Sequence, residues 1–250
     1  MPAPVPPLLA THGLSAGYGD IQVLFDIDLH VAAGEVLALI GANGAGKTSL
    51  LHAVLGLLRT GRGMVQFNGV DVSGLPTHEI VRRGIAMVPE GRRLFSGMSV
   101  EDNLLVACDR ARRRIGHLEP HAYWTLSRTY ELFPVLRENR SVPVDALSGG
   151  QQQMVAIARA LLCGPRLLLC DELSLGLAPA VIQEVYAALP AIAAQGTAIV
   201  LVEQDVALAQ RVSSRLVCLL EGRITLEGAS SSFERTTISR AFFGEPHAMA

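Results

Sequence analysis

The stretch Val36-Leu-Ala-Leu-Ile40 runs without a break into Gly41-Ala-Asn-Gly-Ala-Gly46-Lys47-Thr48. The first part is entirely apolar, which is typical of a strand buried on both faces, and a helical pattern follows from Lys47 to about Leu58. Glycines allow the loop between such a strand and helix to point successive N–H groups at phosphate oxygens, and the helix N-terminus adds positive potential. The stretch therefore predicts a phosphate-binding loop.

The pattern of this loop assigns a role to most of its residues. Lys47 should reach the β- and γ-phosphates of a nucleoside triphosphate, and the hydroxyl of Thr48 should hold Mg²⁺. The other candidate nucleotide-binding positions of the loop are Gly41, Asn43, Gly44, Ala45, Gly46 and Ser49.

A second apolar run, Leu167-Leu-Leu-Cys-Asp171-Glu172, brings two carboxylates to the end of a predicted strand. Open α/β sheets bind ligands at the carboxyl ends of their strands, so we expect these side chains to meet the phosphate-binding loop. Asp171 would orient Mg²⁺ and its waters, and Glu172 would accept a proton from the attacking water. Such a strand end is common by itself, and its pairing with the loop is what indicates nucleotide hydrolysis.

Along the rest of the chain, short apolar runs alternate with helical patterns, which indicates an α/β fold. Further strands are predicted at residues 63–67, 85–88, 197–202 and 216–220, and a long helix at 149–163. The apolar runs are rich in Val, Ile and Leu without alternation, which favours a parallel sheet covered on both faces.

The pattern changes to a helical one between about residues 91 and 150. Ser99 followed by Asp102 is typical of a helix N-cap with a carboxylate at the third helical position. A second helical stretch is predicted from about Ala122 to Leu136, with Pro134 near its end. We interpret this region as a helical insert in the α/β core.

Composition excludes several classes of protein. Half of the 250 residues are hydrophobic and the formal net charge is -2, so the chain should fold, and it lacks a global basic field for nucleic acid or anionic lipid. The four cysteines are far apart with no CxxC pair, which favours reduced and mostly buried thiols. No stretch approaches the ~18 to 20 apolar residues of a membrane span, and the proline-rich start is no signal peptide. Any link to a membrane should come through a partner.

A third motif, Leu147-Ser-Gly-Gly-Gln151, lies at the start of the predicted 149–163 helix. Together with the phosphate-binding loop before it and the Asp171-Glu172 pair after it, this motif resembles the signature of ABC ATPases. Bare N–H groups at a helix start suit an anion. In that family this end faces the γ-phosphate bound to the other subunit of a head-to-tail pair, which implies two half-sites on each chain. The implied phosphate-binding residues are Ser148, Gly149, Gly150 and Gln151.

The same resemblance places five more positions, several of which depart from the family pattern. Tyr18 matches the aromatic residue that stacks on adenine. Glu90 stands where a Gln usually contacts Mg²⁺ and the nucleophilic water. Gln204 takes the place of the switch histidine, and an amide can donate to a phosphate oxygen but cannot become cationic. Leu173 replaces a usual proline, and Ala178 replaces a usual Asp in the segment that crosses to the partner's site.

The residues at these unusual positions are similar to those of one subfamily. The phrases that begin at Val88 (VPEGRRLF), Ser174 (SLGLAP) and Leu201 (LVEQ), with the tail 239–244, resemble one of the two ATP-binding subunits of branched-chain amino acid importers. The resemblance covers about residues 8–245. It implies ATP and Mg²⁺ as ligands, a second ATPase subunit, two transmembrane permease subunits, indirectly a substrate-binding protein, and a peripheral place on the cytoplasmic face of the cell membrane.

The expected fold is α/β, with a RecA-like P-loop NTPase core, an antiparallel β edge near the N-terminus and an inserted helical subdomain. As one ABC ATPase domain, the core would take residues 8–89 and 151–228, the helical subdomain 90–150, and the C-terminal tail 229–250.

Two other functions remain open from the residues. The first is a soluble ABC ATPase that acts on nucleic acid or ribosomes, although only about a hundred residues separate the loop from the signature and one cassette is present. The second is a nucleotide-binding subunit with little catalysis of its own, which the altered Glu90, Leu173 and Ala178 allow. No nucleic acid partner is expected, and the transported substrate stays open among branched-chain amino acids, urea, amides and aromatic acids.

Overall fold

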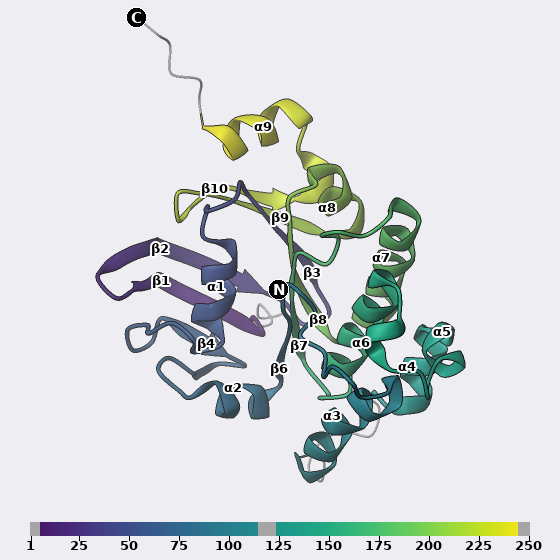
Figure 1. Cartoon of the computed structure of the whole chain (residues 1–250). Coiled ribbons are helices and arrows are strands. Elements are labelled where there is room, and N and C mark those ends of the chain that lie inside the picture. Colours follow the sequence, from purple (N-terminus) through teal and green to yellow (C-terminus); the bar gives the residue numbers. More distant parts are fainter. Residues whose placement is uncertain (1–5, 115–123, 245–250) are drawn as a thin grey trace, which may run out of the picture.

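The computed structural model describes residues 6–114 and 124–244, which form two sheets and the helices around them (Figure 1). The strands are β1 (Leu9–Tyr18), β2 (Ile21–Val31), β3 (Val36–Ile40), β4 (Val65–Phe67), β5 (Val70–Asp71), β6 (Ile85–Val88), β7 (Leu167–Asp171), β8 (Ala198–Glu203), β9 (Arg215–Leu220) and β10 (Arg223–Ala229). The helices are α1 (Lys47–Val54), α2 (Thr77–Arg83), α3 (Val100–Arg114), α4 (Leu126–Leu132), α5 (Pro134–Glu138), α6 (Gly149–Leu161), α7 (Pro179–Ala194), α8 (Val206–Val212) and α9 (Arg235–Phe243), with short 3-10 turns η3 (Val144–Ala146) and η4 (Ser230–Ser232).

The larger sheet has the strand order β10-β9-β3-β8-β7-β6. Its strands β3, β6, β7, β8 and β9 pair in parallel, and β10 adds an antiparallel edge beside β9. This confirms the predicted α/β fold. The order places β8 next to β3 and β7 next to β8, so the residues that follow these three parallel strands share one edge of the sheet.

A smaller antiparallel sheet with the order β2-β1-β4-β5 packs beside the larger one. In it, Leu9 pairs with Val31 on β2 and with Phe67 on β4. This sheet confirms the antiparallel edge expected near the N-terminus. Helix α1 packs between the two sheets, with Leu50 and Leu51 in the same buried cluster as Leu37 and Leu39 of β3 (Figure 1).

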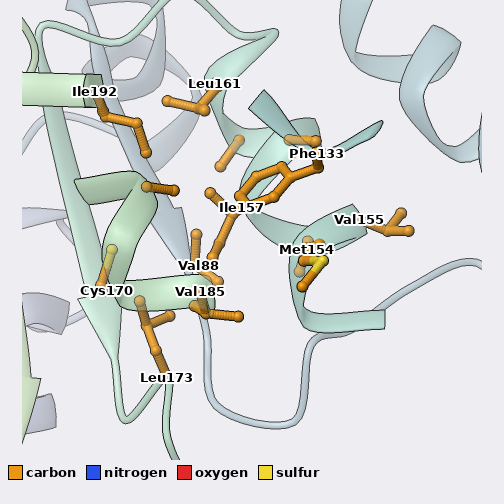
Figure 2. Packing of buried hydrophobic residues seen from close by; sticks show 14 of the residues in the cluster. Val88, Phe133, Met154, Val155, Ile157, Leu161, Cys170, Leu173, Val185 and Ile192 are labelled. Carbon is orange, nitrogen blue, oxygen red and sulfur yellow. The ribbon is translucent and has the colours of Figure 1, made fainter. Parts of the chain in front are cut away.

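The core lies on both faces of the larger sheet because successive side chains of each strand point to opposite sides. Leu167 and Leu169 of β7 pack with α1 and the smaller sheet. The alternate residues of the same strand, Leu168 and Cys170, pack with α6 and α7 on the other face. Figure 2 shows this second cluster, in which Cys170 lies near Leu173. Strands buried on both sides explain the unbroken apolar runs of the sequence.

The helices α3, α4 and α5 lie between β6 and β7 in the chain, as the predicted insert requires. Ser99 caps α3 as expected, since its Oγ accepts from the Asp102 N–H at 3.1 Å. The single helix predicted over 122–136 is wrong, because the chain forms two helices that meet at Phe133. Pro134 begins α5 at its first turn, since a proline has no N–H to continue the hydrogen bonds of α4. The start of that prediction, at residues 122–123, lies outside the described residues.

Several element ends differ from the predicted ones by a few residues. Helix α1 ends at Val54 and α6 at Leu161, whereas the sequence pattern predicts ends at about Leu58 and Cys163. After α6 the chain turns at Gly164, whose φ of 62° favours glycine. Apolar residues continue beyond both helices because they pack in the turns that follow, so hydrophobic pattern alone overestimates the helix length.

Three of the four cysteines have described side chains, Cys163, Cys170 and Cys218. Cys170 and Cys218 are buried and Cys163 is partly buried, which confirms the expectation of reduced, mostly buried thiols for these positions. The side chain of Cys108 and the tail beyond residue 244 lie outside the described residues. Among the helices of 6–114 and 124–244, none is both long and apolar enough to cross a lipid bilayer.

Candidate nucleotide-binding and hydrolysis site

The predicted phosphate-binding loop joins β3 to α1 and has the backbone geometry that its glycines suggested. Gly41, Gly44 and Gly46 have φ values of 150°, 81° and 104°, a region that strains other residues. A Cβ at Gly41 would lie 2.3 Å from the Leu219 carbonyl oxygen of β9, so only glycine fits there. Asn43 is exposed at the tip of the loop. The loop therefore presents bare backbone at the end of the central strand.

Lys47 is the first residue of α1, and its side chain curls back over the loop. Its Nζ donates to the carbonyl oxygens of Gly41 at 2.7 Å and Ala42 at 3.0 Å, and the residue is only 4% exposed. Burial lowers the pKa of Lys47, while the nearby carboxylates of Glu172 and Asp171 oppose this shift. The ammonium group therefore lies in the mouth of the loop, where it can reach phosphate oxygens.

Thr48 and Asp171 bring two hard oxygen ligands together from distant parts of the chain. The Thr48 Oγ1 donates to Asp171 Oδ1 at 3.1 Å. Burial raises the pKa of Asp171, the Thr48 hydrogen bond lowers it, and the charges of Glu172 and Glu90 raise it further. The last of these effects indicates that the exposed Glu90 lies within electrostatic reach of the same carboxylate, while its contact with Mg²⁺ and the nucleophilic water remains a prediction.

This donor set fits Mg²⁺. Magnesium prefers oxygen ligands and is usually held by one or two carboxylates together with substrate phosphates and water. No group of three or more His, Cys, Asp or Glu side chains able to hold a metal occurs in the described parts of the chain. Thr48 and Asp171 are the residues that would hold the ion, which when bound would neutralise charge on the phosphates.

Glu172 and Gln204 form a pair at the ends of β7 and β8. The Gln204 Nε2 donates to Glu172 Oε1 at 2.7 Å, so the amide occupies one carboxylate oxygen and leaves the other available to accept a proton. The Glu172 N–H donates to the Val202 carbonyl at 3.2 Å, and its φ of 48° lies in the left-handed region. Such a conformation costs about 1–3 kcal/mol for a residue other than glycine, and it aims the side chain out of the strand.

The predicted signature begins α6 with a complete capping box. Ser148 Oγ accepts from the Gln151 N–H at 3.3 Å, and the Gln151 Oε1 accepts from the Ser148 N–H at 3.0 Å. Gly150 is buried against α7, where a Cβ would lie 2.0 Å from Val181 Cγ1. Within the described residues, no hydrogen bond connects this cap to the phosphate-binding loop.

Tyr18, the predicted adenine-stacking residue, ends β1 beside the start of α1. Its hydroxyl lies 3.4 Å from both Ser49 Oγ and His52 Nδ1, and half of its surface is exposed. An aromatic ring exposed next to the phosphate-binding helix is available to a nucleotide base. The predicted role of Tyr18 remains a prediction.

Two of the unusual residues have a structural explanation. Leu173 is fully buried in the cluster of α6 and α7, where Figure 2 shows it near Val185, so it replaces the usual proline with core packing. Ala178 occupies the N-cap of α7 and makes no side-chain cap hydrogen bond, and Pro179 follows at the first turn. An Asp at this position would be a favoured N-cap, so its absence leaves the first N–H groups of α7 without that acceptor.

The sequence interpretation missed how the segment after Glu90 is fastened to α6. The Arg159 guanidinium donates to the carbonyl oxygens of Arg92 at 3.2 Å and Arg93 at 2.7 Å, and Arg92 Nη1 donates to Gln152 Oε1 at 3.1 Å. Arg92 and Arg93 both have positive φ. An arginine on the otherwise apolar face of a predicted helix was the signal available at Arg159.

The interpretation also missed a buried carboxylate beside the site. Glu203 ends β8 directly before Gln204, is 1% exposed, and accepts hydrogen bonds from Ser174 and Tyr186. Its signal in the sequence was a carboxylate at the end of an apolar run, the same signal that identified Asp171.

Comparison with known proteins gives one consistent family. The family profile described as "ABC transporter" matches residues 24–174. The high-affinity branched-chain amino acid transport ATP-binding protein BraG of Pseudomonas aeruginosa is 38% identical over 90% of this chain and 94% of its own length. The lipopolysaccharide export system ATP-binding protein LptB of Acidithiobacillus ferridurans is 30% identical over 89% of this chain and 90% of its own length. A solved structure of an ATP-binding subunit of an ABC transporter is 31% identical, with a TM-score of 0.76 over 92% of each chain.

Proposed function

This chain belongs to the ABC transporter family as an ATP-binding subunit with ATPase activity, and on that premise we propose that it energises an importer of branched-chain or similarly hydrophobic amino acids. The observation that carries the proposal is the convergence of Lys47, the Thr48–Asp171 pair and the Glu172–Gln204 pair at one edge of the larger sheet. These groups supply the positive charge, the metal ligands and the base that hydrolysis of a triphosphate needs.

The residues of one chain have separate roles in ATP hydrolysis. The loop from Gly41 to Gly46 and the Lys47 ammonium bind and orient the phosphates. Glu172 accepts the proton of the attacking water on the carboxylate oxygen that Gln204 leaves available. A positioned base of this kind contributes typically ~10²–10⁴-fold to the rate. The amide of Gln204 fixes the orientation of Glu172 without adding a charge that depends on pH.

The signature cap completes the site from a second subunit. The Ser148 hydroxyl and the N–H groups of Gly149 and Gly150 lie at the N-terminus of a 13-residue helix, where positive potential favours an anion. Because no hydrogen bond in the described part of the chain joins this cap to Lys47, we infer that it binds the γ-phosphate held by a partner. Two ATPase subunits would then close head to tail around two ATP molecules, with ATP binding favouring the closed pair.

The cargo is the finer part of the proposal and is supported by similarity. The relative from P. aeruginosa, named for branched-chain amino acid transport, is more similar to this chain than the relative named for lipopolysaccharide export. A peripheral position on the cytoplasmic face of a membrane follows from this proposal. There the chain would dock on two permease subunits through the helical region and the segment beside Glu90, and a substrate-binding protein would deliver the cargo.

The experiment is uptake of radiolabelled leucine into proteoliposomes that contain this chain with its cognate ATPase, permease and binding-protein partners. Phosphate release is measured in parallel. We expect ATP-dependent leucine uptake that Glu172→Gln abolishes, with phosphate release reduced ~10²–10⁴-fold. The control is Glu184→Gln on the exposed face of α7, which should leave both rates unchanged.

The outcomes separate the parts of the proposal. ATP hydrolysis coupled to uptake of urea, amides or aromatic acids, without leucine, would contradict the cargo and retain the importer. Normal uptake with Glu172→Gln would assign hydrolysis to the partner ATPase. Stimulation of phosphate release by nucleic acid or ribosomes, with no uptake, would contradict the importer itself.

A further inference from the structure

Glu203 is a buried carboxylate that forms no ion pair with any cation in the part of the chain that the structure describes. It is the last residue of β8, its side chain is 1% exposed, and the residues before it, Ala198–Val202, are all apolar and buried. None of the ion pairs in residues 6–114 and 124–244 includes it. A carboxylate is costly to bury, so one that is held in the core by neutral groups is poorly explained by stability alone.

The partners of Glu203 come from three different elements. The Ser174 hydroxyl, after β7, donates to Glu203 Oε2 at 2.9 Å, and the Tyr186 hydroxyl of α7 donates to Oε1. The backbone N–H groups of Ser174 and Gln204, near the carboxylate, lower its pKa against the effect of burial. We call Glu203, Ser174 and Tyr186 the Glu203 cluster. It joins the ends of β7 and β8 to α7 below the surface of the site.

The same two chain segments are joined a second time at the surface. Glu172, two residues before Ser174, accepts from Gln204, which directly follows Glu203. The proposed base and its amide partner therefore lie next to a part-buried hydrogen bond that joins the same two chain segments. If the Ser174–Glu203 contact is lost, the side-chain contact that remains between the two strand ends is the exposed Glu172–Gln204 pair, which solvent can weaken, beside the backbone hydrogen bond from Glu172 to Val202.

Ser174 also begins the exposed segment that leads to Ala178 and α7. Leu175 and Gly176 in this segment are exposed, and Ala178 supplies no side-chain cap. The hydrogen bond from Ser174 to Glu203 therefore attaches the start of this segment to the core beside the site, and Leu177 packs against the core further along.

We propose that Glu203 is a positioning residue for ATP hydrolysis, which holds the Glu172–Gln204 pair and the start of the 174–178 segment in place through the hydroxyls of Ser174 and Tyr186. This inference rests on the proposed role of Glu172 as the base. It assigns a function to a carboxylate that does not touch the nucleotide-binding loop.

The test measures kcat and KM for MgATP in the assembled transporter. We expect Ser174→Ala and Glu203→Gln each to lower kcat on the order of ten- to a hundredfold, because small displacements of catalytic groups have effects of this size. The KM for ATP should change less than about twofold, since Lys47 and the loop that binds the phosphates stay intact. The conservative Ser174→Thr, which keeps the hydroxyl, should restore most of the rate. The double variant Ser174→Ala with Glu203→Gln should be no slower than the slower single variant, because both remove one interaction.

The matched control is Thr197→Val. Thr197 is also buried, it precedes β8 at the opposite end, and its Oγ1 donates to the Pro165 carbonyl at 3.1 Å. This variant should lose stability without losing kcat at a temperature where it is folded. Wild-type kcat in Ser174→Ala and Glu203→Gln, or a loss no larger than that of Thr197→Val, would overturn the proposal. If instead Glu172→Gln hydrolyses ATP normally, the premise about the base is wrong.

Discussion

Replacement of Glu203 by Gln should change how stability depends on pH. Burial raises the pKa of Glu203 from its ordinary value of 4.5 to about 7 in the folded chain. Between these two values the folded chain keeps a proton that the unfolded chain has released. The contribution of Glu203 to the free energy of unfolding is therefore fully present below pH 4.5 and is lost as the pH rises through about 7.

The size of this effect follows from the difference between the two pKa values of Glu203. That difference corresponds to a loss of about 3 kcal/mol in the free energy of unfolding as the pH rises from 4.5 to about 7. The titratable groups that face Glu203 are Tyr186 on α7, Glu172 after β7, Cys170 on β7 and, at longer range, Lys47 on α1. All of them are present in both the wild type and Glu203→Gln, so to first order their own titrations cancel in the comparison.

The assay is urea unfolding of the isolated chain and of Glu203→Gln at a series of pH values from about 5 to 8. The wild type should lose up to about 3 kcal/mol relative to the variant over this range, or roughly 6–12 °C in Tm for a chain of this size. Glu184→Gln, on the exposed face of α7, should show the wild-type dependence. A difference between wild type and Glu203→Gln that does not change with pH would refute the argument, because it would mean that Glu203 titrates normally in the folded chain.

Three further predictions follow from the contacts of α6 and of the switch position. Gly150→Ala places a Cβ against Val181 and should lower the unfolding free energy by about 1–2 kcal/mol in urea titrations; if Val181→Ala does not restore it, the close packing is not the cause. Ser148→Ala removes the cap of α6 and should cost about 1 kcal/mol, whereas Ser141→Ala at an exposed position should cost nothing measurable; equal losses would contradict the role of the cap. Gln204→His should add a titrating step to the pH profile of ATP hydrolysis between about pH 5 and 8, and an unchanged profile would contradict the place of Gln204 at the site.

The sequence alone determined the features that depend on neighbouring residues. The glycines of the loop before Lys47, the capping box at Ser148 and the cap at Ser99 are formed by groups only a few residues apart. Their geometry follows from local backbone conformation, so a short pattern is enough to predict them. The α/β class was also predictable, because strands buried on both faces need unbroken apolar runs.

The tertiary structure decided which distant side chains meet. Thr48 and Asp171 are 123 residues apart, and Ser174 and Glu203 are 29 apart, yet each pair forms a hydrogen bond. These contacts exist because the sheet places β3, β8 and β7 side by side, an order that no local pattern contains. The break between α4 and α5 at Phe133 follows from Pro134, a local signal that the sequence prediction placed near the end of a single helix. The partners of Glu203 were outside the reach of the sequence, because they depend on how elements pack, and packing energy is summed over contacts that form only when the chain is folded.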